Sequence, residues 1–326
     1  MNPRAARDPA QARNRIFGML SAYITHPSSL LHEMGTDHPD CPQRVSAVHD
    51  RLLAQGLLDF MVPYTAPAAT REQVERVHAS LYVAELVASA PTSGYRRFDP
   101  DTSMNPHTLD AAWHAAGAAV LATELVARGE AATAFCNVRP AGHHATRSTG
   151  MGFCFFNNVA VGIAHALATF GMERVALIDF DVHHGNGSED IFAGDDRVLM
   201  VSTFEQGLYP YNGEVATGPN LCNVPLARYS RGDALRAAVV ERWLPALDAF
   251  RPQMVFVSAG FDAHRDDDMS RLGWLDADFA WLTREIVAVA QRHAQGRIVS
   301  MLEGGYVLPV LARSAATHVQ VLIGAD

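Results

Sequence analysis

The amino-acid sequence predicts an α/β fold, with a doubly wound, mostly parallel sheet flanked by helices. Apolar runs with strand character alternate with longer segments of helical periodicity, and hydrophobic residues make up 48% of the 326 residues. Acidic residues and histidines directly follow several of the apolar runs, where an open parallel sheet holds its ligands. Because there is neither an internal repeat nor a linker, we expect residues 16–326 to form a single domain behind a flexible arm of residues 1–15.

The helices are predicted from apolar spacing and from the residues that end them. A loop rich in His, Pro and Asp at 32–44 leads into a helix at 45–55, which stops at Gly56. An alanine-rich helix at 108–128 closes at Gly129. Further helices are predicted around 77–82 and at 157–170, 232–250, 276–293 and 310–322.

Short apolar runs predict strands that are buried on both faces. They lie at 132–138, 174–178, 198–202, 254–258 and 297–301. Loops are expected at 63–70, 91–102 and 207–225. The last of these is long and rich in glycine and proline, and such a loop in a compact domain is more often functional than idle.

Composition excludes several classes of partner. The net charge is -9, so there is no general basic surface and a nucleic-acid partner is not indicated. Residues 1–15 are polar and arginine-rich without an apolar core, and no apolar stretch is long enough for a bilayer, so we expect neither a secretory signal nor a membrane partner. The four cysteines are scattered, which is typical of reduced thiols in the cytoplasm.

The strongest chemical signal is the stretch from Leu177 to Gly187, where a buried strand runs into acids, histidines and glycines. Asp181 and His183 are two residues apart, so on an extended backbone their side chains leave the same face. A carboxylate beside an imidazole suits Zn²⁺ or a neighbouring first-row metal. The alternative is that Asp179 and Asp181 cap the next helix while the histidines are packed or solvated.

Polar residues at the other strand exits complete a candidate active site. With Asp262, the pair Asp181 and His183 would supply three ligands and leave an open coordination position, the mark of a catalytic metal. The tandem His143 and His144 supply a candidate base, although such a pair also occurs in structural turns.

Three further residues have candidate roles beside the tandem histidines. Asp179 and Asn186 could each orient one imidazole, and because only the acid favours a charged partner, the two histidines need not do the same job. Tyr306 follows two glycines at the last strand exit and could donate to an oxyanion. A Gly-Gly-Tyr sequence by itself would indicate only a turn.

At this point a family resemblance becomes visible. The chain resembles the zinc-dependent histone deacetylase family, which includes bacterial histone deacetylase-like amidohydrolases and acetylpolyamine amidohydrolases, from about residue 32 to the C-terminus. The motifs that carry the resemblance are, in order, Arg139–His144, Gly152–Asn158, Asp179–Gly187, Ser258–His264 and Glu303–Tyr306.

The resemblance implies an arginase-like α/β fold and hydrolysis of an acetylated amine to the free amine and acetate. By this comparison zinc is held by Asp181, His183 and Asp262, His144 is the general base, His143 is its electrostatic partner or acid, and Tyr306 stabilises the tetrahedral intermediate. A structural potassium ion is implied at Asp179, Asp181, His183 and Ser202. Arg44 matches an arginine of an internal channel, and Asp101 matches a loop acid that contacts the substrate. Residues matching the substrate tunnel are Gly152, Phe153, Tyr209, Met269, Asp101 and Gly304.

Some positions depart from the commoner family patterns. Ala141 replaces a second proline, and Phe204 stands where the family often has histidine. Asn186 matches the class II side of the family, and the presence of Tyr306 favours deacetylase activity. Met269 stands where one polyamine-selective relative has a glutamate.

Three functional readings follow. The first is a zinc amidohydrolase acting on acetyl-lysine or a related acylamide, small molecule or peptide, with an acetylpolyamine substrate as the alternative. The related arginase class would need two bridged manganese ions and more carboxylates around the central motif. A catalytically silent acyl-lysine binding module would have lost a metal ligand or Tyr306, and neither is lost. A homo-oligomer is compatible with each reading, and the compact single domain suggests a bacterial source.

Overall fold

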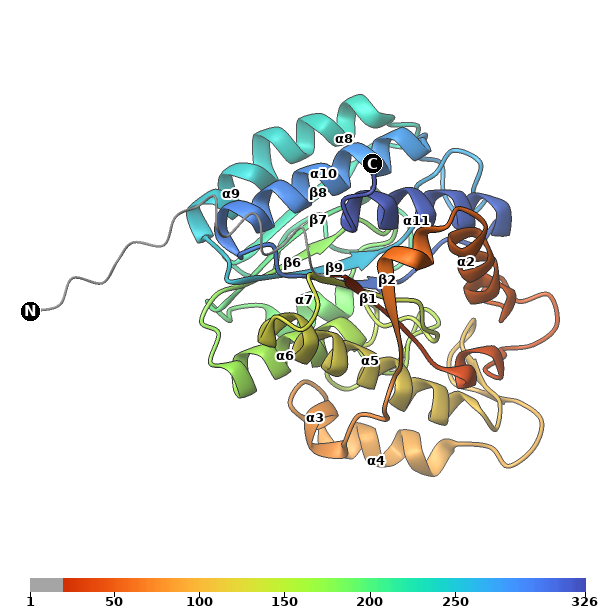
Figure 1. The fold of residues 1–326 in the computed structure, drawn as a ribbon. Helices are drawn as coiled ribbons and strands as arrows, with labels where there is room; N and C mark the ends of the chain where they lie inside the picture. Colours follow the sequence, from red (N-terminus) through yellow and green to blue (C-terminus); the bar gives the residue numbers. More distant parts are fainter. Residues whose placement is uncertain (1–19) are drawn as a thin grey trace, which may run out of the picture.

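A wholly parallel, eight-stranded sheet forms the centre of the fold (Figure 1), in a computed structural model that describes residues 20–326. Across the sheet the strands run β2-β1-β5-β10-β9-β6-β7-β8. Their bounds are β1 Ser21–Thr25, β2 Met61–Thr65, β5 Thr133–Cys136, β6 Val175–Asp179, β7 Val198–Glu205, β8 Leu221–Leu226, β9 Met254–Ala259 and β10 Ile298–Leu302. The predicted α/β fold with a parallel sheet is confirmed, and the predicted arm of residues 1–15 lies outside the described residues.

Helices cover both faces of the sheet (Figure 1). One layer contains α2 (Gln43–Ala54), α8 (Gly232–Ala238), α9 (Leu244–Phe250), α10 (Asp276–His293) and α11 (Leu308–Leu322). The other contains α3 (Arg71–Glu75), α4 (Ser80–Ser89), α5 (Thr108–Arg128), α6 (Asn158–Phe170) and α7 (Asn186–Phe192). Short helical turns η1 (Pro27–Leu30), η2 (Leu57–Phe60) and η3 (Val239–Trp243) and a small antiparallel pair, β3 (Arg96–Arg97) with β4 (Ser103–Met104), complete the described chain.

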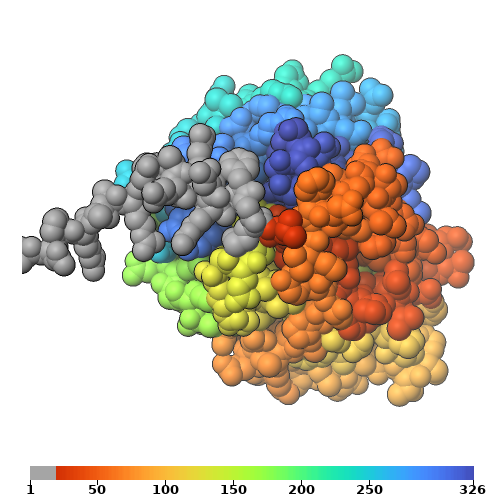
Figure 2. All heavy atoms as spheres, in the orientation of Figure 1, coloured from red at the N-terminus to blue at the C-terminus, as the bar shows by residue number. Residues whose placement is uncertain are grey.

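Each face of the sheet has its own hydrophobic core. Strands β6 and β9 are buried along their whole length, which explains why they read as continuous apolar runs. One core packs α5 and α6 against the sheet, and the other packs α2, α10 and α11. Helices α2 and α11 come from opposite ends of the chain and contact each other, and Figure 2 shows early, orange segments beside the dark blue α11. Among the helices of residues 20–326, none combines the length and apolar character that crossing a bilayer requires.

The structure corrects the predicted elements mainly at the edges of the sheet. β2 overlaps the predicted loop at 63–70, and β8 overlaps the predicted loop at 207–225. Both are edge strands that contain a proline, Pro63 and Pro225, and proline in a sheet is confined to such positions. They therefore lack the apolar run by which the central strands were recognised. The short strand β1 was also not predicted.

The helix predicted around 77–82 is interrupted. Helix α3 ends at Glu75 and α4 begins at Ser80, with a turn between them. The buried His78 occupies this turn, where its ring lies 2.8 Å from the carbonyl oxygen of Thr146 and accepts a 2.9 Å hydrogen bond from the Asn157 N–H. These long-range contacts stabilise the turn between α3 and α4, which the local periodicity of the sequence does not reveal.

Candidate metal centre and active site

The candidate site lies at the carboxyl ends of four adjacent central strands. Strands β5, β10, β9 and β6 are neighbours in the sheet, and their exits lead to His143, Tyr306, Asp262 and Asp181 respectively. Because all four strands run in the same direction, residues far apart in sequence meet at one edge. The topology thus brings together the residues that the sequence placed at strand exits.

Asp181, His183 and Asp262 form a compact buried cluster, with one potential ligand atom from each lying within 4.8 Å of the others. The Nδ1 atom of His183 is 3.0 Å from Asp181 Oδ1 and 3.2 Å from Asp262 Oδ2. The backbone N–H groups of His183 and Val182 donate to Asp181 and Asp262. An imidazole nitrogen and two carboxylate oxygens therefore converge on one point.

This cluster fits a bound zinc ion. Asp262 Oδ2 is buried and accepts no well-aligned hydrogen bond, although it lies close to His183, so its charge lacks a full partner within the described protein. Gly304 borders the cluster and donates its N–H to Asp181 Oδ2 at 2.7 Å. A Cβ at Gly304 would overlap both carboxylates, and one at Gly260 would overlap Asp181. One nitrogen and two oxygen donors from three residues are a ligand set that catalytic zinc accepts.

The two adjacent histidines are held by different partners. His143 Nδ1 lies 3.1 Å from Asp179 Oδ2, whereas His144 Nδ1 lies 2.7 Å from the amide oxygen of Asn186. Burial lowers the pKa of His143, but the negative charges of Asp181 and Asp179 outweigh it and raise the pKa to about 10. Burial and the positive charges of His143 and His183 hold the pKa of His144 well below its ordinary value. The pair thus separates into a charged and a neutral imidazole.

Tyr306 follows Gly305, whose backbone is in the left-handed region at φ 114°. The Tyr306 ring lies edge-on to Phe153 at 5.9 Å, and the guanidinium carbon of Arg44 is 4.7 Å from its centroid. Burial holds the pKa of Tyr306 well above its ordinary value against the opposing effect of Arg44. The hydroxyl therefore keeps its proton at neutral pH and is available as a hydrogen-bond donor.

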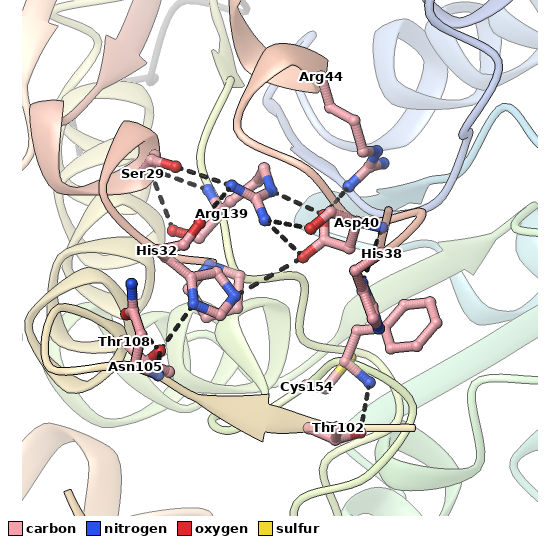
Figure 3. A network of polar contacts seen from close by, with 12 residues as sticks. Ser29, His32, His38, Asp40, Arg44, Thr102, Asn105, Thr108, Arg139 and Cys154 are labelled. Atoms are coloured by element: carbon pink, nitrogen blue, oxygen red, sulfur yellow. Dashed lines mark hydrogen bonds and ion pairs between the residues drawn. The ribbon is translucent and has the colours of Figure 1, made fainter. Parts of the chain in front are cut away.

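Arg44 belongs to a buried ionic network (Figure 3). The carboxylate of Asp40 accepts hydrogen bonds from Arg44 at 2.7 Å and from Arg139 at 2.7 and 2.9 Å. His32 Nε2 lies 3.7 Å from the same carboxylate. Arg44 also donates to the carbonyl oxygens of Gly305 and Glu303, so the network lies directly behind the Tyr306 turn.

Several predicted tunnel residues surround the histidine pair and Tyr306. The Tyr209 ring is 5.3 Å from that of His144, and a Cβ at Gly152 would meet both rings. Phe153 lies between Tyr306 and His38, with ring distances of 5.9 and 4.6 Å.

The other two predicted tunnel residues are tied to this region through the backbone. Asp101 is exposed, and its carbonyl oxygen lies 2.9 Å from Nε2 of His38. Met269 donates its N–H to Asp267, whose second oxygen accepts the N–H of Tyr306.

Of the four residues predicted around potassium, Asp181 and His183 belong to the buried cluster with Asp262, and Asp179 and Ser202 lie beside it. Ser202 is the register partner of Asp179 across β6 and β7. Asp179 Oδ1 accepts the Asp181 N–H at 3.1 Å, and the Ser202 hydroxyl is 3.2 Å from the amide oxygen of Asn223. Carboxylate, hydroxyl and amide oxygens are the donors that hard cations take.

Sequence reasoning missed three carboxylates that position the site. Glu303 is buried and accepts the N–H groups of Gly142 and His143, at 2.7 and 3.2 Å, so it holds the histidine loop. Asp267 holds the Tyr306 turn, and Asp40 holds the two buried arginines. Glu303 and Asp40 stood inside motifs noted in the sequence, but nothing in the sequence identified their partners.

The chain is similar to known proteins over most of its length. A family model described as "Histone deacetylase domain" matches residues 38–322. The chain is 38% identical over 277 residues to a histone deacetylase-like amidohydrolase of Pseudomonas aeruginosa, covering 82% of this chain and 72% of that protein. It is 34% identical over 328 residues to the human polyamine deacetylase HDAC10, covering 94% of this chain and 48% of that protein. The crystal structure of the HDA15 HD domain superimposes with a TM-score of 0.87 at 30% identity, covering 94% of this chain and 90% of that one.

Proposed function

The chain belongs to the histone deacetylase family of deacetylases and amidohydrolases, and from this premise we propose that it is a zinc-dependent amidohydrolase. Its substrate is an acetylated amine, acetyl-lysine or a related acylamide, which it hydrolyses to the free amine and acetate. The observation that carries the proposal is the convergence of His183 Nδ1 with the Asp181 and Asp262 carboxylates, next to a histidine pair with opposite charge preferences.

Asp181, His183 and Asp262 would hold the ion. A zinc ion bound there would polarise the acyl carbonyl and lower the pKa of a bound water. Gly304 and Gly260 leave room for the two carboxylates, and the Gly304 N–H fixes the orientation of Asp181. Three protein ligands leave a coordination position open for water and substrate.

His144 is the proton acceptor in this proposal. Its imidazole is held neutral, and Asn186 fixes the orientation of its ring without adding charge. His143 is kept positively charged by Asp179 and Asp181, so it stabilises negative charge that develops on the substrate. Tyr306 keeps its proton and donates a hydrogen bond to the oxyanion of the tetrahedral intermediate.

The surroundings of the site favour a cationic or lysine-like substrate. Phe153 and Tyr209 supply aromatic walls beside Tyr306 and His144. Asp101 is exposed, and its carbonyl oxygen contacts His38, whose ring packs against Phe153. The carboxylate of Asp101 would attract a positively charged group at the entrance. The unacetylated amines of an acetylpolyamine are also positively charged, so an acetylpolyamine is the alternative substrate.

Two further assignments belong to the proposal. A potassium ion would be held by oxygen atoms around Asp179, Asp181, His183 and Ser202, where it would brace the segment that carries the zinc ligands. The reaction would take place in the cytoplasm, a setting supported by the four cysteines, which are free thiols in the structure.

The test is turnover by purified, zinc-loaded protein, with an acetyl-lysine peptide, acetylputrescine and acetylspermidine as substrates and a chelator as control. We expect chelator-sensitive turnover of at least one substrate. His183→Ala should bind one equivalent of zinc less than the wild type and should lose turnover, whereas His107→Ala, at an exposed histidine before α5, should match the wild type in both. A His183→Ala protein that holds as much zinc as the wild type would refute the ligand assignment, and zinc-loaded protein that hydrolyses no acylamide would point to the silent binding module.

A further inference from the structure

Thr102 is buried directly before β4 and contacts two residues of the proposed substrate tunnel. Its hydroxyl donates to Asp101 Oδ1 at 3.0 Å and accepts the Phe153 N–H at 3.0 Å, the second of these contacts being drawn in Figure 3. An ionised carboxylate can only accept a hydrogen bond and an amide N–H can only donate one, so the hydroxyl gives its proton to one partner and a lone pair to the other. One side chain therefore connects the acid at the entrance with the aromatic wall of the tunnel.

The backbone of Phe153 needs a partner of this kind. Gly152 and Phe153 are the central residues of a tight turn, in which both have positive φ, 54° and 68°, as in a type I′ turn. The main chains of Met151 and Cys154 close the turn with hydrogen bonds of 3.0 and 2.9 Å. Glycine adopts positive φ freely, whereas a bulky residue such as phenylalanine does so only where its surroundings hold it. The turn itself does not use the Phe153 N–H, which instead binds Thr102 on another loop.

The loop that carries Asp101 is fixed through its main chain. Asp99 Oδ1 accepts the N–H groups of Asp101 and Thr102, at 2.9 and 2.6 Å. From the other side, His38 Nδ1 accepts the Asp40 N–H at 3.1 Å, so Nε2 of the neutral ring carries the proton. This Nε2 donates to the Asp101 carbonyl oxygen at 2.9 Å. The main chain of Asp101 is thus held by its neighbours, while the hydroxyl of Thr102 orients its carboxylate.

The main chain of Thr102 is anchored independently of its hydroxyl. Its N–H donates to Asp99, and its carbonyl oxygen accepts the N–H groups of Phe98 and Asp99 at 2.8 and 3.2 Å. Loss of the hydroxyl would therefore leave these main-chain contacts in place. It would remove both the donor to the Asp101 carboxylate and the acceptor of the Phe153 N–H. The hydroxyl thus has an effect on the two tunnel residues that can be separated from the folding of its own loop.

We propose that Thr102 is a positioning residue for the substrate. Its hydroxyl holds the Asp101 carboxylate in a fixed place relative to the Phe153 ring, and so sets the affinity for substrates that carry a positive charge at the tunnel entrance. This role depends on the proposed function, which gives both residues a place along the substrate. The competing explanation is a hydroxyl that satisfies two polar groups and contributes to stability alone. The positive φ of Phe153 favours the positioning role, because the contact that holds this conformation comes from the loop of the entrance acid.

A matched pair of substrates tests the role. N-pentylacetamide differs from acetylputrescine only by a methyl group in place of the terminal ammonium. With Thr102→Val we expect KM for acetylputrescine to rise about tenfold at unchanged kcat, as the loss of one hydrogen bond to a charged group would give, and KM for N-pentylacetamide to rise less. Thr102→Ser keeps the hydroxyl and should restore the wild-type KM. The control Thr123→Val removes an equally buried hydroxyl, which donates to Ala119 within α5, and should match the wild type.

A double-mutant cycle locates the effect at the entrance acid. Asp101→Asn, at an exposed position, should also raise KM for acetylputrescine. In the Asp101→Asn protein, Thr102→Val should raise KM by less than it does in the wild type, because the charge through which the hydroxyl acts is gone. Thr102→Ala, which removes the hydroxyl without adding a group, should give the same results as Thr102→Val. Circular dichroism and zinc content establish that each variant is folded and loaded.

Several outcomes would overturn the positioning role while leaving the deacetylase function intact. They are an unchanged KM for acetylputrescine in Thr102→Val, an equal rise for both substrates, and full additivity with Asp101→Asn. Wild-type protein that hydrolyses no acylamide would instead refute the proposed function. Calorimetric titration of the zinc-loaded protein with acetylputrescine then decides the role of Thr102: affinity about tenfold weaker in Thr102→Val supports it, and equal affinity or no binding at all overturns it.

Discussion

The amide oxygen of Asn186 lies 2.7 Å from Nδ1 of His144, at the position where the adjacent His143 faces a carboxylate instead, that of Asp179 at 3.1 Å. An amide orients an imidazole without favouring its charged form, whereas a carboxylate favours the imidazolium. This difference acts in the same direction as the charge of Asp181, which favours a charged His143, and as burial, which favours a neutral His144. This difference makes His144 the residue whose titration can be moved by a single substitution.

Asn186→Asp should raise the pKa of His144. A base must be neutral to accept a proton, so kcat/KM falls as pH drops below the pKa of His144. A carboxylate in place of the amide should move this acidic limb to higher pH, by about 1–3 units. The measurement is the pH profile of kcat/KM for both proteins, with zinc content checked at each pH. An acidic limb at the same pH in both would show that His144 is not the titrating base.

Tyr306→Phe should keep zinc and substrate binding but lose turnover. The substitution removes only the hydroxyl, while the ring contacts with Phe153 and Arg44 remain possible. One oxyanion donor contributes about 10²–10³ in rate, so kcat should fall by that factor with little change in KM. The control is Tyr211→Phe, at an exposed tyrosine close to Tyr209 in the sequence, which should leave kcat unchanged. Full activity in the Tyr306→Phe protein would remove this residue from the mechanism.

Asp40→Ala should destabilise the fold strongly. The carboxylate accepts hydrogen bonds from two buried arginines, Arg44 and Arg139, and Figure 3 shows both guanidinium groups directed at it. These arginines hold the pKa of Asp40 well below its ordinary value against the effect of burial. Removing the acid leaves two buried positive charges without their partner, which costs about 3–5 kcal/mol.

Urea unfolding measures this loss, with Asp50→Ala on the exposed side of α2 as the control that should change stability little. Arg44→Ala should cost less than Asp40→Ala, because Arg139 still pairs with the acid. An Asp40→Ala protein as stable as the Asp50→Ala control would mean that the network contributes nothing to folding.

The central strands were predictable because a strand that is buried on both faces consists mostly of apolar residues, as β6 and β9 do. The edge strands β2 and β8 were not, because each is only partly buried, contains a proline and has one partner strand.

The same contrast holds in the site. Residues at strand exits, such as Asp181 and Asp262, could be proposed from the sequence because polar residues follow directly on an apolar strand, and the folded chain brings these two close together. Asp267 was not identified, because its function depends on reaching the Tyr306 N–H across 39 positions of sequence, a contact that only the folded chain makes.

His318 provides a pH-dependent contribution to stability that is separate from the site. Its ring is fully buried, with Nδ1 2.8 Å from the Thr283 hydroxyl and Nε2 2.9 Å from the Ser300 hydroxyl. Thr283 also donates its hydroxyl to the carbonyl oxygen of Phe279 at 2.7 Å, so it accepts from His318, whose neutral form thus carries the proton on Nδ1. Burial lowers the pKa of His318 to about 3.

In the unfolded chain the pKa of this histidine returns to about 6.5. Between pH 6.5 and 3 the unfolded chain therefore binds a proton on this histidine that the folded chain does not. The contribution of His318 to the free energy of unfolding is therefore fully present above pH 6.5 and is lost as pH falls toward 3. The slope for one group is at most about 1.4 kcal/mol per pH unit. His32 and His78, whose pKa values burial lowers to about 4, add slopes of the same sign. His318→Gln removes only its own contribution, so unfolding free energies measured in urea at pH 7.5, 6 and 5 should depend less steeply on pH in the variant. Parallel pH dependences in the two proteins would show that His318 is not neutral in the folded state.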